Sequence, residues 1–283
     1  MKSPDAWVVQ APDIAPATLH ALARHAAARA IIPCGNGKPV AYRLPVPARQ
    51  PALADAAAAA SCDAGFVPGA RRQDRVRVVA MDMDSTLITI ECIDEIADLH
   101  GIKAEVAAVT ASAMRGEIEF AESLRRRVRL LAGLPEAALL RVYDERLRIT
   151  PGAQRMLAGF RAVGAKTLLV SGGFTFFTER LKARLQLDHT LANSLGVKDG
   201  ILTGDVEGAI VDAHAKADMV AAWKSKYAGS DGLVVTLGDG ANDLPMFAVA
   251  DVSIAYRAKP VVRAAATHTI DHCGLDAALN YFS

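Results

Sequence analysis

Two carboxylates stand one residue apart in the segment Asp82-Met83-Asp84-Ser85-Thr86, directly after the apolar run 76–81. Such a run is typical of a buried strand, and open parallel sheets bind ligands beyond the carboxyl ends of their strands. An acidic pair at that place could hold a cation, transfer a proton, or do both. The same residue types are common in turns and at helix N-caps, so the segment alone does not decide its role. An EF-hand is excluded, because its glycine and glutamate positions hold Leu87 and Ile93.

Two further apolar segments end in residues that could bind a phosphate or a cation. Segment 168–170 leads into Ser171-Gly172-Gly173, whose hydroxyl and backbone N–H groups could receive an anion. Segment 233–237 leads into Gly238-Asp239-Gly240-Ala241-Asn242-Asp243, which adds two carboxylates and an amide. Between them, Lys216 lies at the start of a helical pattern, although by itself it would be interpreted as a surface lysine.

Together these residues supply the groups that magnesium-assisted phosphoryl transfer requires. A phosphate dianion needs a hydroxyl and N–H donors, a lysine and a hard cation offset its charge, and carboxylate oxygens hold such a cation. We therefore expect the three strand ends to share one edge of a sheet, and we predict Mg²⁺ as the cofactor.

The pattern resembles the four motifs of the haloacid dehalogenase-like (HAD) phosphatases. The motifs are Asp82-x-Asp84-x-Thr86, Ser171, Lys216 and Gly238-Asp239-Gly240-x-Asn242-Asp243. The resemblance extends from about residue 76 to the carboxyl terminus and is specific, because order, spacing and strand context agree. Within that superfamily the chain is most similar to the phosphoserine phosphatases, through the segments 81–87, 91–97, 123–128, 170–174 and 202–208.

The resemblance implies a role for each motif residue. Asp82 would be the nucleophile that forms an aspartyl-phosphate, and Asp84 would protonate the leaving serine oxygen and then deprotonate the attacking water. Mg²⁺ would bind Asp82, the backbone carbonyl of Asp84, and Asp239, with Asp243 supporting this metal site. Thr86 would make an orienting hydrogen bond. The implied reaction converts O-phospho-L-serine to L-serine and phosphate, the last step of serine biosynthesis.

The resemblance also implies the residues that hold the substrate, which are Ser171, Gly172, Lys216, Glu91, Arg127 and Asn242. Glu91 would bind the ammonium group of phosphoserine and Arg127 its carboxylate, which a guanidinium matches with two hydrogen bonds. Without the family pattern, Arg127 belongs to a basic run of the kind that usually forms a solvated helix face, and Glu91 could be an ordinary first-turn residue.

The expected architecture is an α/β, three-layer, HAD-like (Rossmann-like) core with a parallel sheet, because strands alternate with helices. Strands are predicted at 166–170, 233–237, 252–255 and 267–270, a turn at 198–200 joins two short strands, and helices are predicted at 175–185, 216–227, 244–249, 260–265 and from Leu275. An insert at about 89–150, with helical periodicity, is predicted to form a helical cap over the crevice. The core with this cap would occupy residues 73–283.

Residues 1–72 are predicted to form a small α+β module with a regulatory, structural or dimerising role. Strands are expected at 6–10 and 40–44, helices at 18–30 and 52–60, and a turn at 33–37. No motif in the module identifies a ligand, and a homodimer stays compatible with the sequence.

The composition fits an enzyme of modest size. The 283 residues, of which 52% are hydrophobic, suffice for one large core and a small domain. The net charge of +1, without a long basic stripe, argues against nucleic acid as a partner. Four scattered cysteines favour reduced thiols over disulfides or zinc. No segment approaches the ~20 apolar residues of a membrane span, and the start lacks the apolar core of a signal peptide. We therefore expect a soluble cytoplasmic protein that acts on a small molecule.

Three other functions fit parts of the sequence pattern. A dinucleotide-binding oxidoreductase is disfavoured because Asp243 stands where the third glycine of the fingerprint belongs and would repel a pyrophosphate. A non-catalytic serine sensor is disfavoured because both Asp82 and Asp84 are present. A HAD phosphatase for another small amino-acid or hydroxy-acid phosphate stays open.

Overall fold

The structure is a computed structural model that describes residues 4–35, 37, 39–46 and 48–283. It divides into two compact units, each described by itself: the first consists of Met1–Ala80, Thr150–Thr167 and Val220–Ser283, and the second of Met81–Ile149 and Leu168–Met219. Among the described residues, no helix has both the length and the hydropathy that crossing a membrane requires.

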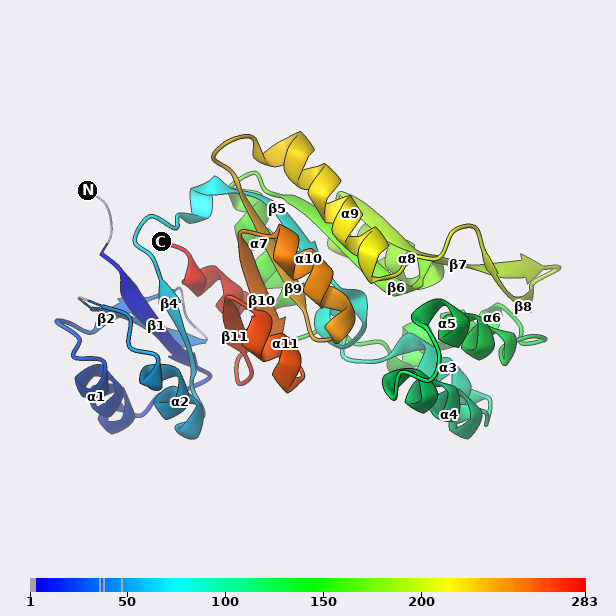
Figure 1. The fold of residues 1–283 in the computed structure, drawn as a ribbon, viewed down its shortest axis with the longest axis horizontal. Coiled ribbons are helices and arrows are strands. Elements are labelled where there is room, and N and C mark those ends of the chain that lie inside the picture. Colours follow the sequence, from blue (N-terminus) through cyan, green and yellow to red (C-terminus); the bar gives the residue numbers. More distant parts are fainter. Residues whose placement is uncertain (1–3, 36, 38, 47) are drawn as a thin grey trace. The chain divides into compact units, whose positions relative to one another are not determined.

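The N-terminal module is a four-stranded antiparallel sheet in the order β2-β3-β1-β4, with two helices packed against it (Figure 1). The strands are β1 (Ala6–Ala11), β2 (Ile32–Cys34), β3 (Val40–Pro45) and β4 (Asp63–Val67), and the helices are α1 (Pro16–His25) and α2 (Ala52–Ala59). Trp7 and Val9 of β1 belong to the apolar cluster that includes α1 and α2. Two predicted strands and both helices are present, whereas β2 and β4 were not predicted. The predicted turn at 33–37 includes Asn36, which lies outside the described residues.

The opposite face of this sheet is also buried. Val8 and Gln10 of β1 are fully buried. Gln10 Oε1 accepts a hydrogen bond of 2.8 Å from Asn280, which lies in the 3₁₀ segment Leu275–Tyr281 of the same unit. The module is therefore packed on two faces, and its second face contributes to the core of the first unit.

The larger sheet has seven strands in the order β11-β10-β9-β5-β6-β7-β8 (Figure 1). They are β5 (Val76–Met81), β6 (Lys166–Phe174), β7 (His189–Lys198), β8 (Ile201–Glu207), β9 (Leu233–Gly238), β10 (Val252–Tyr256) and β11 (His268–Ile270). Registers between β6 and β7, β9 and β10, and β10 and β11 are parallel, as predicted. The fold is α/β with a mostly parallel sheet.

Strand β8 differs in direction, because it pairs antiparallel with β7. Asp199 and Gly200 join the two strands with φ values of +53° and +74°. Two central residues with positive φ form the tight turn that suits a β-hairpin, and a hairpin is necessarily antiparallel.

Helices connect the strands of the larger sheet. They are α7 (Ala153–Ala162), α8 (Thr175–Leu185), α9 (Ala213–Trp223), α10 (Leu244–Val249) and α11 (Pro260–Ala265). The ends of α8, α10 and α11 agree with the prediction. Helix α9 ends at Trp223, before the predicted Tyr227, and a wider π-helical turn, Lys224–Ala228, follows it. The predicted last helix from Leu275 is a 3₁₀ segment, Leu275–Tyr281.

The insert after β5 is helical. Its helices are α3 (Cys92–Leu99), α4 (Lys103–Met114), α5 (Phe120–Arg129) and α6 (Ala137–Arg141), followed by the π-helical turn Val142–Arg146. They lie together in the second unit (Figure 1). An isolated β-bridge between Ile88 and Ile149 joins the two ends of the insert.

Candidate active site

Asp82 and Lys216 form a buried ion pair in the second unit. Asp82 directly follows β5, and its Oδ1 accepts a hydrogen bond of 2.7 Å from the backbone N–H of Met83. Its Oδ2 lies 2.9 Å from Nζ of Lys216, and the two residues are 5% and 1% exposed. Removing either partner from such a pair leaves an uncompensated buried charge. Lys216 is therefore not the surface lysine that its sequence alone suggested.

The second carboxyl, Asp84, has a raised pKa. Its Oδ1 accepts a hydrogen bond of 2.9 Å from the backbone N–H of Cys92 at the start of α3. Burial and the neighbouring Glu91 carboxylate raise the pKa of Asp84 to about 8, against the weaker effect of the Cys92 hydrogen bond. A carboxyl that keeps its proton near neutral pH is suited to act as a general acid.

Gly173 lets the carboxyl end of β6 approach Asp84. A Cβ atom at Gly173 would lie 2.7 Å from Oδ2 of Asp84 and 2.8 Å from Cε of Met83. Any side chain there would displace the carboxyl. Gly173, which was predicted to help bind an anion, therefore also allows the close approach of Asp84, the candidate general acid.

Ser171 and Gly172 lie in the last part of β6, which continues to Phe174 and so extends beyond the predicted strand end at residue 170. Ser171 is 1% exposed, and its Oγ accepts a hydrogen bond of 2.9 Å from the backbone N–H of Gly173. Thr86, in the loop after β5, is also fully buried.

Asn193 of β7 is a residue that sequence reasoning missed. Its Nδ2 donates to the backbone oxygens of Gly172 at 2.9 Å and Val211 at 3.2 Å, and its Oδ1 accepts from the Val211 N–H at 2.8 Å. Asn193 is 1% exposed. It therefore connects the end of β6 at Gly172 to the segment that leads into α9 and Lys216. No motif in the sequence marked Asn193, which is a polar residue before the predicted turn at 198–200.

Arg127 and Glu91 lie near Asp84 in the same unit. Arg127 is partly buried on α5, and burial lowers its pKa although the nearby carboxylates of Asp94, Glu91 and Asp84 oppose that effect. Oε1 of Glu91 accepts a hydrogen bond of 2.6 Å from the hydroxyl of Ser85. Arg127 and Glu91 thus bring a cation and an anion near Asp84 within the second unit.

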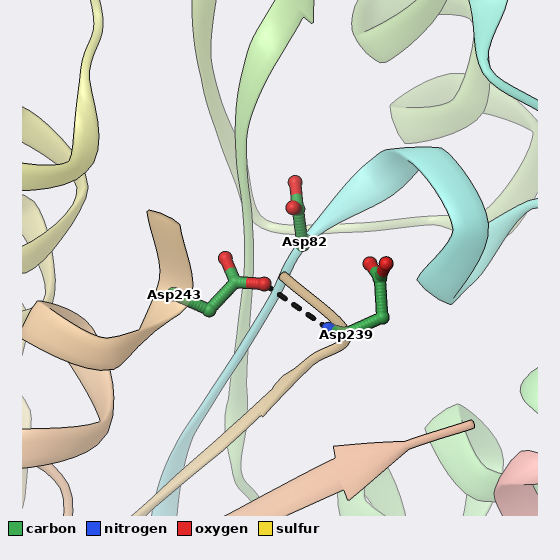
Figure 2. Close-up of side chains that lie close together, drawn as sticks. All are labelled: Asp82, Asp239 and Asp243. Atoms are coloured by element: carbon green, nitrogen blue, oxygen red, sulfur yellow. Dashed lines mark hydrogen bonds between the residues drawn. The ribbon is translucent and has the colours of Figure 1, made fainter. Parts of the chain in front are cut away.

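Carboxylate oxygens of Asp82, Asp239 and Asp243 all lie within 4.8 Å of one another (Figure 2). Oδ2 of the fully buried Asp243 accepts hydrogen bonds of 3.1 Å from the backbone N–H groups of Asp239 and Gly240. Asp243 thereby fixes the loop that carries Asp239. A set made only of oxygen donors fits a hard cation such as Mg²⁺ and does not favour zinc, which prefers nitrogen and sulfur.

Gly238 is required beside this cluster, because a Cβ atom there would lie 2.3 Å from Oδ2 of Asp243. Asn242 is exposed in the short turn Ala241–Asp243. Its role in positioning the substrate stays a prediction.

Comparison with known proteins identifies the family. A profile of haloacid dehalogenase-like hydrolases matches residues 79–248. A curated relative from Polaromonas sp. (strain JS666 / ATCC BAA-500), named phosphoserine phosphatase, is 50% identical over 205 residues, which cover 71% of this chain and 87% of the relative. The chain belongs to the haloacid dehalogenase-like hydrolase family.

Two further similarities place this HAD hydrolase within the family. A phosphoserine phosphatase from Albidiferax ferrireducens (strain ATCC BAA-621 / DSM 15236 / T118) is 46% identical over 223 residues, which cover 77% of this chain and 94% of the relative. The crystal structure of a probable phosphoserine phosphatase from Vibrio cholerae, in its unliganded form, superposes with a TM-score of 0.84 and 34% sequence identity. That similarity covers 98% of this chain and 85% of the other, so it includes the N-terminal module.

Proposed function

We propose that this HAD hydrolase converts O-phospho-L-serine to L-serine and phosphate, the last step of serine biosynthesis. The observation that carries the proposal is the combination of two groups in one unit. The buried Asp82–Lys216 pair suits attack on a phosphate ester, and Glu91 with Arg127 suits a zwitterionic amino acid. The curated relatives at 50% and 46% identity are both named phosphoserine phosphatase.

The chemistry assigns two steps to two carboxyls. In the first step a carboxylate oxygen of Asp82 bonds to phosphorus, the bond from phosphorus to the serine oxygen breaks, and Asp84 gives its proton to that oxygen. In the second step Asp84 takes a proton from water, the water oxygen bonds to phosphorus, and the Asp82 carboxylate leaves. Asp84 thus ends each cycle protonated, as a carboxyl with a pKa of about 8 allows.

The phosphoryl oxygens would be held by Ser171, the backbone N–H of Gly172 and Lys216. Asp82, Asp239 and the backbone carbonyl of Asp84 would hold Mg²⁺, and Asp243 would fix the loop of Asp239 through its two hydrogen bonds. When bound, Mg²⁺ would supply positive charge that offsets the charge of the phosphoryl group. Thr86, which is fully buried in the segment after Asp82, would orient that segment.

The proposal also covers the cellular compartment of the protein and the roles of its domains. The cysteines are free thiols, which supports a reducing compartment such as the cytoplasm. For residues 1–72 we propose a structural module rather than a catalytic one, with residues 73–283 as the phosphatase core and 89–150 as its cap. Light scattering of the full chain measures its molar mass in solution and so tests whether the protein forms a homodimer. A mass of one chain, 29.9 kDa, would contradict a dimer.

Phosphate release from four substrates tests the proposal. L-phosphoserine, phosphothreonine, 3-phosphoglycerate and an aryl phosphate are compared with Mg²⁺ and with EDTA. We expect phosphoserine to exceed the others by orders of magnitude in kcat/KM, and EDTA to stop the reaction. Equal kcat/KM for all four substrates would leave the hydrolysis in place and would contradict the amino-acid specificity.

A further inference from the structure

The carboxyl of Asp84 is held by the first residue of helix α3. That residue, Cys92, is 1% exposed, and its backbone N–H donates to Oδ1 of Asp84 at 2.9 Å. The first N–H groups of a helix have no acceptor within the helix itself, so the carboxyl satisfies one of them. The thiol of Cys92 donates a second hydrogen bond to the same carboxyl. Two donors of one residue therefore fix this side of Asp84.

The other oxygen of Asp84 lies against the carboxyl end of β6. A Cβ atom at Gly173 would lie 2.7 Å from Oδ2 of Asp84 and 3.1 Å from Oγ of Ser171. The two oxygens thus flank the same small space, and both residues belong to the second unit. Oδ2 is therefore the oxygen of Asp84 on the side of Ser171, which is proposed to hold the phosphoryl group.

The hydrogen bond at Oδ1 decides which oxygen carries the proton of Asp84. In a protonated carboxyl, one oxygen bears the hydrogen and donates, and the other oxygen accepts. Oδ1 accepts from the N–H of Cys92, so the proton belongs on Oδ2. The terminal torsion of an aspartate is broad and roughly two-fold, so a carboxyl without such donors would exchange its two oxygens by rotation. The donors of Cys92 oppose that rotation.

We propose that Cys92 is a positioning residue for proton transfer, because its N–H and its thiol hold the carboxyl of Asp84 so that Oδ2 presents the proton to the leaving oxygen. In the transfer the bond from Oδ2 to hydrogen breaks, and its electron pair stays on Oδ2. The proton bonds to the ester oxygen as the bond from that oxygen to phosphorus breaks. This inference rests on the proposed phosphatase activity.

Two leaving groups of different basicity test the role of Cys92. Phenyl phosphate and 4-nitrophenyl phosphate are compared with Mg²⁺ present, and neither carries the amino and carboxyl groups of an amino acid. Phenolate is more basic than nitrophenolate, so its departure depends more strongly on a well-placed acid. The measured quantity is kcat/KM, which reports the step in which the leaving group departs. A thiol that only filled the core would affect both substrates equally.

The variants separate the thiol donor from its volume. Cys92→Val and Cys92→Ala remove the donor with a larger and a smaller side chain, and Cys92→Ser restores a donor. Ile96→Val is the matched control, because it removes one buried carbon from the same helix and no hydrogen bond. The backbone N–H of residue 92 stays in every variant. Circular dichroism checks that each variant folds.

We expect the donor-free variants to lose about three- to tenfold more kcat/KM on phenyl phosphate than on 4-nitrophenyl phosphate, the range that one hydrogen bond supplies. Cys92→Ser should recover most of that difference, and Ile96→Val should change both substrates equally. Equal losses on both substrates in the donor-free variants, or no recovery in Cys92→Ser, would overturn the positioning role and leave the hydrolysis in place. A wild-type protein that hydrolyses neither these esters nor phosphoserine would instead overturn the proposed function, and this inference with it.

Discussion

Arg127 differs from its basic neighbours in its surroundings. Arg125 and Arg126 are exposed on α5, and Arg126 lies 2.6 Å from Glu122, one turn away. Arg127 is partly buried, and burial lowers its pKa while the acidic groups of Asp94, Glu91 and Asp84 oppose that effect. A solvated helix face, which the basic run alone suggests, explains Arg126 and does not explain Arg127.

Arg127→Ala should raise the KM for phosphoserine far more than the KM for an aryl phosphate. A hydrogen bond to a charged group contributes about 1.5–3 kcal/mol, which corresponds to roughly 10- to 100-fold in binding. Steady-state kinetics on both substrates measures the difference. Arg125→Ala, on the exposed side of the same helix, is the control. Equal losses on both substrates would remove the carboxylate-binding role from Arg127.

At the scale of elements, the site depends on contacts between loops that follow different strands. Asn193 of β7 holds the Gly172 carbonyl and the Val211 segment. Asn193→Ala should leave these backbone groups unsatisfied, which costs about 1–3 kcal/mol per group. We expect the inhibition constant of inorganic phosphate to rise about tenfold, because the phosphate loop loses its support. Ser194→Ala, at the next position, should leave that constant nearly unchanged; an equal effect of both variants would refute this role.

His268 of β11 should make the stability of the protein depend on pH. Burial, and then the charges of Arg71 and Arg49, lower the pKa of His268 well below its ordinary value of 6.5. The folded protein therefore keeps His268 neutral while the unfolded chain takes up a proton. The stability contribution is complete above about pH 6.5 and is lost as the pH falls, by about 1.4 kcal/mol per pH unit.

Urea unfolding between pH 7 and pH 5 measures that dependence. His268→Gln should lose the part of the slope that one proton explains. His25→Gln removes an exposed histidine from the end of α1 and should keep the slope. An unchanged slope in the His268 variant would show that other groups titrate in this range.

For the whole molecule, the structure joins the N-terminal module to the C-terminal part of the chain by buried polar groups. The carboxylate of Asp63, at the start of β4 and 3% exposed, accepts backbone hydrogen bonds from Asp271 at 2.7 Å, His272 at 3.1 Å and Cys273 at 3.0 Å. These contacts lie within one unit and connect residues more than 200 positions apart. The module is thus part of a common core.

Asp63→Ala should destabilise the full chain by about 3 kcal/mol, because one buried and two partly buried backbone N–H groups lose their acceptor. The midpoint of urea unfolding measures the loss. Asp55→Ala, an exposed carboxylate on α2, should change the midpoint little. A midpoint that Asp63→Ala does not shift would mean that the module contributes little to the stability of the unit.

The sequence predicted those parts of the molecule in which an apolar strand ends at residues suited to bind a phosphate or a cation. Strand ends that carry Asp82, Ser171 and Asp239 could be located because apolar runs stop at charged or glycine-rich segments. Asn193 could not be found, because its function lies in bonds to two distant loops and its neighbours show no motif. Strand β4 was missed because Asp63 and Gly65 are poor strand formers, and only their packing against the C-terminal part explains them.

The most direct test of the account is the site of covalent phosphorylation. The protein is mixed with L-phosphoserine and Mg²⁺, quenched in acid within milliseconds, digested, and analysed by mass spectrometry. The account predicts phosphate on Asp82 and none in the Asp82→Asn variant, which should release no phosphate. That variant should still fold, with a lower stability because Lys216 keeps a buried charge without its partner. Phosphate on another residue, or turnover retained by Asp82→Asn, would contradict it.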